Sequence, residues 1–296
     1  MRISVVVPSY NRAHLLKRTL PTYINQEDVI ELILVDDCST DDTEKVVKEL
    51  QNEYPQIRYF RNQKNSKQPY SNNVGILNAV GDYIYFGDDD SILMPDSIHY
   101  LKETILKYNV QICGAKALFL PDGYNGSEYD YIREMDVPCP EGEKIVDIGK
   151  LSAKFIYSVS EPVTVPFCHA SAIVKTDLAR KVMFDTGYTG NAYREETDFF
   201  VRCSFQGARI MYDSRAVQLN LPRQTAHGGA HSGGRLKWYM SAVRNNWYFL
   251  DKNWDSLRRK YNVTRGKYMV QACFVCDLFV AGARNFMNII FHRRHD

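Results

Sequence analysis

The chain has 296 residues, of which 45% are hydrophobic and 24% are charged, and its formal net charge is +2. This composition is typical of a folded globular protein, and the small net charge gives no reason to expect nucleic acid as a partner. The seven cysteines are odd in number and scattered, which favours reduced thiols in a cytoplasmic protein over a disulfide framework.

We expect neither a secretion signal nor a membrane-spanning helix. The chain opens with the apolar run at residues 3–7, whereas a signal would begin with basic residues ahead of a longer apolar run. The best candidate for a spanning helix, residues 268–291, is interrupted by Asp277 and Arg284, although such a helix needs about 20 mainly apolar residues. The sequence therefore predicts a cytoplasmic protein.

The first 120 residues alternate between strand and helix patterns. Short runs of β-branched and other apolar residues predict strands, and apolar residues at helical spacing predict the helices between them. Strands are expected at residues 3–7, 32–35, 57–60, 83–86 and 112–120, and helices at residues 11–25, after the capping residues 39–42, at 71–79 and at 95–108.

Beyond residue 120 the pattern is less regular. Residues 121–142 predict a long excursion, and residues 221–234 predict a loop with four glycines and two histidines, which has the composition of a lid. Helices are expected near residues 151–157, from 176, at 195–206, 236–250 and 268–291, and short strands at 172–174, 210–212 and 216–219.

This alternation predicts an α/β fold. Strands that alternate with helices of this length form a mostly parallel sheet with helices on both faces, and right-handed connections make the layer Rossmann-like. Residues 221–296 are expected to add the loop and a helical C-terminal extension.

Three of the predicted strands end in polar residues, at the edge where ligands bind in doubly wound sheets. The first strand is followed by residues 8–12, the second by Asp36 and Asp37, and the fourth by residues 88–90. Random surface charge would not favour strand ends of one polarity, so the sequence predicts a ligand site at this edge.

Asp88, Asp89 and Asp90 place three carboxylates within about 10 Å, at a rise of about 3.3 Å per residue. Like charges so close repel unless a cation lies among them. Mg²⁺ or Mn²⁺ binds carboxylate oxygens, usually one or two of them together with substrate phosphates. A solvated turn is the alternative, but at a strand end in this fold we favour a divalent metal site.

Two further acidic pairs have both a structural and a functional interpretation. Asp36 and Asp37 either cap the following turn or accept hydrogen bonds from a nucleobase or ribose, as an acid at the second strand end does in dinucleotide-binding folds. Neither a dinucleotide-binding glycine motif nor a P-loop is present. Glu195 and Glu196 open a helix, where acids are favoured by the helix dipole, or one of them is a general base for an acceptor hydroxyl.

With these residues the sequence resembles the inverting glycosyltransferases of family 2, which have the GT-A fold. The resemblance covers residues 3–220 and rests on motifs in the family's order and spacing. These motifs are residues 4–12, residues 35–43, residues 71–75 with 81–83, residues 86–90 with Pro95, and residues 194–199. Within the fourth motif, residues 88–90 match the family's Asp-x-Asp loop.

The resemblance implies a role for each matching residue. Asp88 and Asp90 would bind Mn²⁺ or Mg²⁺, with Asp90 as the more direct ligand, and Glu196 would be the base, with Glu195 and Asp198 as alternatives. The nucleotide would lie against Pro8, Tyr10, Arg12, Asp36, Asp37, Lys67, Asn72 and Asp89.

Two positions depart from the family pattern. The family often has arginine where this chain has Asn72, which leaves a bound diphosphate one positive charge short unless Lys67 or Arg61 compensates. A histidine after the last strand, which can join the metal site in the family, is Asn220 here. Either His227 or His231 in the glycine-rich loop would substitute for it, unless these are ordinary surface histidines.

The implied activity is transfer of a sugar, with inversion, from a nucleotide diphosphate donor to an acceptor in glycan biosynthesis. UDP-sugar is favoured as donor and GDP-mannose is the alternative, while the acceptor is a glycan hydroxyl, a lipid-linked glycan or a lipid phosphate. Residues 1–120 would form the nucleotide-binding half of a catalytic domain, residues 121–220 its acceptor half, and residues 221–296 the lid and the C-terminal helices.

The C-terminal helix has an apolar stripe beside a basic chain end. Such a stripe either packs against the catalytic domain or a second subunit, which we favour, or lies on an anionic membrane at its inner face. Cys273 and Cys276, within this stripe, are expected to be core residues.

Three rival functions differ in what the sequence should contain. A nucleotidyltransferase needs a glycine-rich phosphate loop near the N-terminus, which residues 8–12 do not form, and a signalling receiver domain is far shorter. A non-catalytic nucleotide- or glycan-binding descendant is the main alternative, although the intact set of acids disfavours it.

Overall fold

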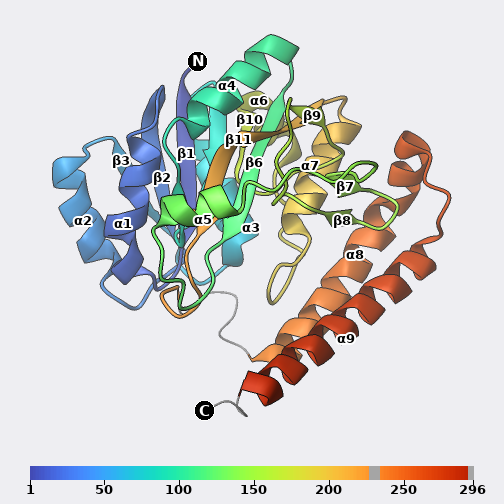
Figure 1. Cartoon of the computed structure of the whole chain (residues 1–296). Coiled ribbons are helices and arrows are strands. Elements are labelled where there is room, and N and C mark those ends of the chain that lie inside the picture. The colour runs from blue at the N-terminus through green and yellow to red at the C-terminus, as the bar shows by residue number, and fades with distance from the viewer. Residues whose placement is uncertain (227–233, 293–296) are drawn as a thin grey trace.

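The computed structural model describes residues 1–226 and 234–292, without the side chains of Arg235 and residues 281–292. A central sheet carries helices on both faces, and a pair of long C-terminal helices packs along one side (Figure 1). In the first 120 residues the strands are β1 Ile3–Ser9, β2 Val29–Asp36, β3 Ile57–Arg61, β4 Tyr83–Phe86, β5 Ser91–Leu93 and β6 Ile112–Phe119, and the helices are α1 Ala13–Ile24, α2 Thr43–Glu53, α3 Lys67–Asn78 and α4 Ser97–Tyr108.

The remaining elements include most of those predicted, and also three two-residue strands and a helix at residues 128–134 that the sequence does not predict. The strands are β7 Val146–Asp147, β8 Ser152–Ala153, β9 Val163–Thr164, β10 Ala172–Lys175 and β11 Ile210–Asn220, and the helices are α5 Glu128–Glu134, α6 Thr176–Val182, α7 Glu195–Phe205, α8 Arg235–Tyr261 and α9 Lys267–His292.

Alternating side chains of the central strands build a core on each face of the sheet. In β1, Val5 and Val7 pack with the residues of α1, α2 and α4, whereas Val6 packs with those of α3, α6 and α7. Each of these valines is fully buried. Because a strand points successive side chains to opposite faces, a continuous apolar run such as β1 requires cover on both.

The sheet topology brings several strand ends to one edge. The strand order is β3-β2-β1-β4-β10-β6-β11-β5, and β1 runs parallel to both β2 and β4. β10 is antiparallel to β4 and to β6, so β6 runs in the direction of β4. The predicted mostly parallel α/β sheet is therefore confirmed, with β5, β9 and β10 as its antiparallel members.

Some local predictions differ from the structure. The helix predicted near residues 151–157 is wrong, because Leu151 has a left-handed φ of 50° and the short strand β8 follows it. The two strands predicted at 210–212 and 216–219 are one strand, β11, whose pairing with β6 is interrupted between Asp213 and Val217. β5 was not predicted.

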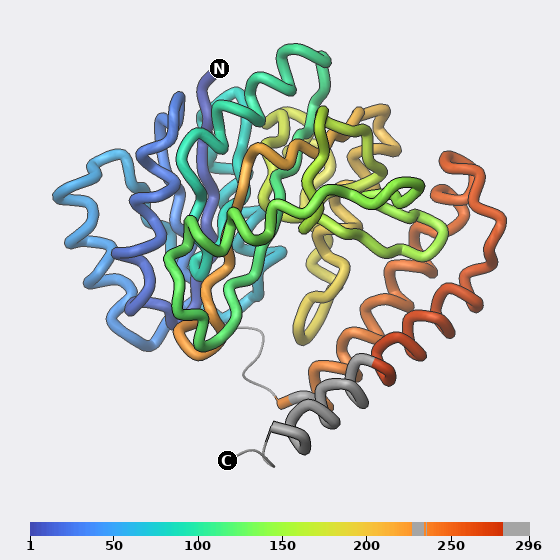
Figure 2. The backbone as a smooth tube through the Cα atoms, viewed as in Figure 1, coloured from blue at the N-terminus to red at the C-terminus, as the bar shows by residue number. Residues whose placement is uncertain are grey.

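The two long C-terminal helices form a hairpin on the side of α7, and α9 is its outer helix (Figures 1 and 2). The prediction that Cys273 and Cys276 are core residues is wrong, since both are exposed on α9. α8 buries Phe249, Leu250 and Trp254 in the larger core. Among the described residues no helix has the length and apolar content needed to cross a membrane.

Candidate active site

A cavity of about 370 Å³ opens where the carboxyl ends of β1, β2, β4 and β6 meet. The starts of α3 and α7 and the segment after β11 complete its walls. Its lining comes from several separate segments, namely Pro8, Ser9, Tyr10, Arg12, Asp37, Asn65, Lys67, Gln68, Ser71, Asp88, Asp89, Asp90, Phe119, Gly190, Asn191, Ala192, Glu196, Asn220, Leu221, Arg223 and Ala226.

The structure brings most of the predicted site residues together in this cavity. The predicted residues that line it are Pro8, Tyr10, Arg12, Asp37, Lys67, Asp88, Asp89, Asp90 and Glu196. Four others, Asp36, Asn72, Glu195 and Asp198, lie behind its walls and are buried. His227 and His231 lie outside the described residues.

Neutral donors hold the first two carboxylates of the Asp-x-Asp loop. Gln218 Nε2 donates to Asp88 Oδ2 at 3.0 Å, and Gln68 Nε2 lies 3.4 Å from Asp88 Oδ1. The backbone N–H of Tyr10 donates to Asp89 at 3.3 Å. The carboxylates therefore have fixed positions but little compensating charge.

Among the residues that the structure describes, Arg12 is the cation that forms an ion pair with these acids. Its Nη1 lies 3.3 Å from Asp90 Oδ2, and its side chain is only 5% exposed. Arg12 Nε and Nη1 have no hydrogen-bond partner among the described residues. Because buried polar groups are normally hydrogen-bonded, these donors are suited to an anion supplied by a ligand.

Burial and like charge shift the pKa values of the acids. Burial, followed by the charges of Asp90, Glu196 and Asp89, raises the pKa of Asp88 well above its ordinary value of 3.8. Burial and the charge of Asp90 raise the pKa of Asp89 to about 7, although Arg12 opposes this. A cation among these oxygens would relieve the repulsion.

The donor set fits a divalent cation that shares its coordination with a ligand. The described residues contain no group of three or more His, Cys, Asp or Glu side chains arranged to hold a metal alone. Mg²⁺ and similar ions usually bind one or two carboxylates together with substrate phosphates. The Asp-x-Asp carboxylates and an unsatisfied guanidinium match that arrangement.

The adjacent acids at the end of β2 have different surroundings. Asp36 is fully buried and accepts hydrogen bonds from the Ser39 N–H at 2.7 Å, the Tyr59 hydroxyl at 2.6 Å and Arg61 Nη1 at 2.8 Å. Its carboxylate is thereby saturated and fixes the turn and the end of β3.

Asp37 faces the cavity while it caps the start of α3. It accepts from Asn62 Nδ2 at 2.8 Å and from the backbone N–H groups of Ser66 at 2.8 Å and Lys67 at 2.7 Å. The second carboxylate of the pair is thus the one that a nucleotide in the cavity can reach.

The candidate cations for a bound diphosphate differ in whether they reach the cavity. Arg61 binds Asp36 and does not line the cavity, and Asn72 is buried, whereas Lys67 lines the cavity. Arg223, which no sequence motif singles out, also lines the cavity and has no hydrogen bond or ion pair with any other residue the structure describes. Its place just after β11, at a strand end, was the available signal.

Only one of the three acids at the start of α7 reaches the cavity. Glu196 lines it, whereas Glu195 is 4% exposed and its Oε2 has no partner among the described residues. Burial, then the charges of Glu196, Asp88 and Asp198, raises the pKa of Glu195 well above its ordinary value. Asp198 is fully buried and binds Arg202 and Asn253.

Asn220 lines the cavity at the position of the family's histidine. Its side chain accepts from the Ser91 hydroxyl at 2.8 Å and donates to the Leu118 carbonyl at 2.9 Å. This amide therefore holds β5 and β6 together at the cavity edge.

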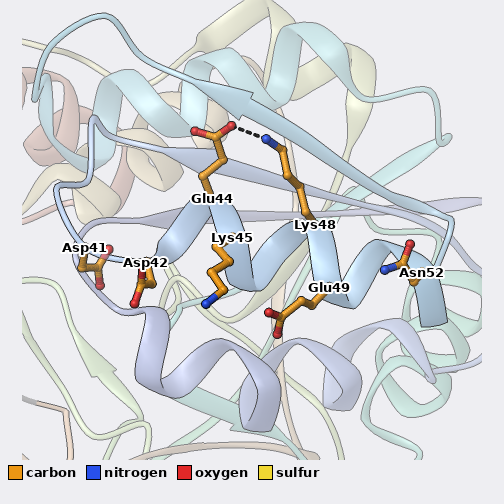
Figure 3. A pocket seen from close by; sticks show the side chains of 7 residues that line it. All are labelled: Asp41, Asp42, Glu44, Lys45, Lys48, Glu49 and Asn52. Carbon is orange, nitrogen blue, oxygen red and sulfur yellow. Dashed lines mark hydrogen bonds and ion pairs between the residues drawn. The ribbon is translucent and has the colours of Figure 1, made fainter.

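A second hollow, of about 620 Å³, lies on the surface along α2 and the turn before it (Figure 3). Its side chains alternate in charge, as in the ion pair of Lys48 with Glu44. All its lining residues lie between Asp41 and Asn52 and none comes from the strand ends that carry the acidic motifs, so it has the features of a solvated helix face.

Solved structures with similar backbones have the GT-A fold of glycosyltransferases. TarS residues 1–349 of S. aureus, in complex with UDP-GlcNAc, is similar with a TM-score of 0.58 at 18% identity, over 94% of this chain and 72% of that one. The mannosyltransferase PcManGT of Pyrobaculum calidifontis, with GDP-Man and Mn²⁺, has a TM-score of 0.59 at 15% identity, over 96% of this chain and 75% of that one.

The sequence comparisons give the family. Residues 4–170 match the profile of glycosyl transferase family 2, and the chain belongs to this family. A relative in Campylobacter jejuni, GalNAc(5)-diNAcBac-PP-undecaprenol beta-1,3-glucosyltransferase, is 38% identical over 104 residues, which are 34% of this chain and 34% of that protein. The chain thus covers about a third of the length of that relative.

Proposed function

We propose that this protein is a metal-dependent glycosyltransferase that moves a sugar from a nucleotide diphosphate donor to an acceptor hydroxyl. The observation that carries the proposal is the single cavity shared by Asp37, the Asp-x-Asp loop and Glu196. A binding protein without turnover would have no use for a cavity-facing base beside a metal motif, so catalysis is the better explanation.

We assign the nucleotide to the β1–β2 side of the cavity. Asp37 would accept hydrogen bonds from the base or ribose, and Pro8 and Tyr10 would flank it. The diphosphate would lie between the Asp-x-Asp loop and two cations, Lys67 and Arg223. UDP is the favoured carrier and GDP the alternative, since similar folds occur with UDP-GlcNAc and with GDP-Man.

Asp88 and Asp90 would hold Mn²⁺ or Mg²⁺ together with the diphosphate, and the bound ion would neutralise charge on the leaving group. Arg12 pairs with Asp90, and its unpartnered donors would face the anionic ligand, while Asp89 would accept from the Tyr10 N–H beside it. Glu196, at the start of α7, would take the proton from the acceptor hydroxyl as its oxygen attacks the anomeric carbon, which would give inversion in a single displacement.

We propose a carbohydrate hydroxyl, free or on a lipid-linked glycan, as the acceptor. Phe119 ends β6 beyond the Asp-x-Asp loop, lines the cavity and is 60% exposed, so its ring can cover the apolar face of a sugar. The Campylobacter relative is named for an undecaprenol-linked acceptor. Contact of α9 with a membrane surface stays the alternative to packing, and the exposed Met269 and Val280 of its apolar stripe would mediate it.

The first experiment is a thermal shift titration of the purified protein with UDP and GDP, each with Mn²⁺ or with chelator. A nucleotide at 100 times its dissociation constant should stabilise the fold by about 2.7 kcal/mol. We expect one nucleotide to stabilise the protein, with Mn²⁺ only. No shift with either nucleotide under any metal condition would contradict the proposal.

Substitutions make this experiment specific to the cavity. Asp88→Asn with Asp90→Asn should abolish the metal-dependent shift, and Arg223→Ala should weaken nucleotide binding about 10- to 100-fold, because hydrogen bonds to charged groups contribute about 1.5–3 kcal/mol. Lys48→Ala, on the outer face of α2, is the control that should bind as the unchanged protein does. Equal affinity of the Arg223 variant would remove that residue from the diphosphate site.

A further inference from the structure

The segment that leads into the candidate base has an unusual backbone. Gly190, Ala192 and Arg194 all have left-handed φ values, of 65°, 51° and 76°. For Ala192 and Arg194 this conformation is strained and persists only where the surroundings enforce it. Asn191 and Ala192 line the cavity, and Glu196 follows two residues after the last strained position.

Two neighbouring asparagines of α8 enforce this conformation from behind. Asn245 donates to the Thr189 carbonyl at 2.7 Å and its Oδ1 accepts from the Thr189 N–H at 3.3 Å. Asn245 also donates to Asn191 Oδ1 at 3.2 Å, and Asn191 in turn donates to the Trp238 carbonyl at 3.2 Å. The first half of the segment is therefore hydrogen-bonded to α8.

The second half of the segment is held through Arg194. Its Nε donates to Asn246 Oδ1 at 2.9 Å and its Nη2 to the Leu151 carbonyl at 2.8 Å. Asn246 also donates to Gln271 Oε1 of α9 at 2.7 Å. Asn246 is fully buried, so its bonds to Arg194 and Gln271 are shielded from water.

An aromatic contact ties the same segment to α9. The ring of Tyr193 stacks on that of Phe274 with 5.3 Å between centroids. The Arg194 guanidinium lies over both rings, at 4.9 Å and 5.8 Å from their centroids. Both helices of the C-terminal hairpin thus fix the segment from residue 189 to 194.

We propose that Asn245, Asn246 and Arg194 are positioning residues, through which the α8–α9 hairpin holds Glu196 aimed into the cavity. The inference rests on the proposed role of Glu196 as the base. It makes the hairpin, which the sequence suggests as a C-terminal extension, a working part of the acceptor half.

The test compares Asn246→Leu, which removes both hydrogen bonds, with Asn246→Asp, which still accepts from Arg194. Asn253→Leu is a matched control on the same helix, because Asn253 bonds Asp198 and Phe249 and not the segment. For each variant we would measure amide hydrogen exchange of residues 189–196. We would also measure release of nucleoside diphosphate from UDP-glucose, UDP-GlcNAc and GDP-mannose with Mn²⁺. Both measurements would be made below the melting temperatures of all the variants.

We expect Asn246→Leu to speed exchange at residues 189–196 at least about 10-fold and to lower kcat about 10- to 100-fold, with donor KM within about twofold. Asn246→Asp should stay within about threefold in kcat, and Asn253→Leu should change neither quantity. Unchanged exchange in Asn246→Leu, an unchanged kcat, or an equal loss in Asn253→Leu would each overturn the inference. Absence of turnover in the unchanged protein would instead contradict the proposed function. The amide exchange rates of residues 189–196 would then decide by themselves whether Asn246 holds the segment.

Discussion

At the scale of single residues, carboxylates of the same type have different roles because their neighbours differ. Asp36 is saturated by Ser39, Tyr59 and Arg61, whereas Asp37, one residue later, faces the cavity. Asp36 is the last residue of β2 and Asp37 follows it, and successive side chains of extended backbone point to opposite sides, so these two acids lie in different environments. The same holds at the start of α7, where a helix turns each successive side chain by about 100°.

Glu195 should make the stability of the protein depend on pH. Its raised pKa means that its contribution to stability is fully present below its ordinary value of 4.5 and is lost as pH rises through the folded value. Glu195→Gln removes this titration. The free energy of unfolding of the variant minus that of the unchanged protein should therefore grow from pH 5 to pH 9, as urea unfolding would measure. If the free energies of unfolding of the two proteins changed equally with pH, the prediction for Glu195 would be wrong.

At the scale of elements, α3 connects the sheet with the cavity. Its N-terminal amides are capped by Asp37, and its middle lies so close to β1 that a Cβ at Gly75 would be 2.2 Å from Val6 Cγ1. A glycine is required there by close packing. The helix is therefore held at both the cavity end and the sheet face.

Gly75→Ala should destabilise the protein by about 1–3 kcal/mol, because extra volume in a packed core forces shifts of backbone and rotamers. The melting temperature and the urea midpoint would measure this loss. Gly266→Ala is the control, since a Cβ at Gly266 meets no atom within 4 Å. Similar stability of the two variants would show that α3 can move away from β1.

At the scale of the whole molecule, buried polar contacts join the C-terminal hairpin to the domain. Asp198 of α7 binds Arg202 within its own helix, Lys252 Nζ of α8 at 3.1 Å, and Asn253 Nδ2 at 2.7 Å. Trp254 of α8 packs in the larger core. The hairpin and the sheet domain are therefore expected to unfold together.

Asp198→Ala should lower the free energy of unfolding by roughly 3 kcal/mol. This is the lower end of the range for breaking a buried ion pair, because the Lys252 and Arg202 side chains are partly exposed. Activity per folded molecule should be largely retained.

Glu196→Gln should show the reverse of Asp198→Ala, with near-normal stability and kcat lowered about 10²- to 10⁴-fold. Denaturant unfolding and initial rates would separate them, and loss of activity without loss of stability in Asp198→Ala would make it the base.

Much of the fold and part of the site could be predicted from the sequence. The apolar runs and helical spacings are local patterns, so the strands from β1 to β4 and the helices between them were predicted within a few residues. The helix predicted near residues 151–157 is absent because Leu151 is buried in a left-handed conformation. In addition, Phe155 packs against the ring of Tyr212, which lies 57 residues further along the chain and donates a hydrogen bond to the Phe155 carbonyl.

The sequence by itself determined the α/β class, the edge of the sheet at which acids gather and the family motifs, because each depends on neighbours in the chain. Only the tertiary structure decided that Asp37 and Glu196 face the cavity while Asp36 and Asp198 are saturated, and that Arg223 joins them. The physical reason is distance along the chain. Asp198 is paired by Asn253, 55 residues away, and no local pattern encodes which distant group satisfies a buried charge.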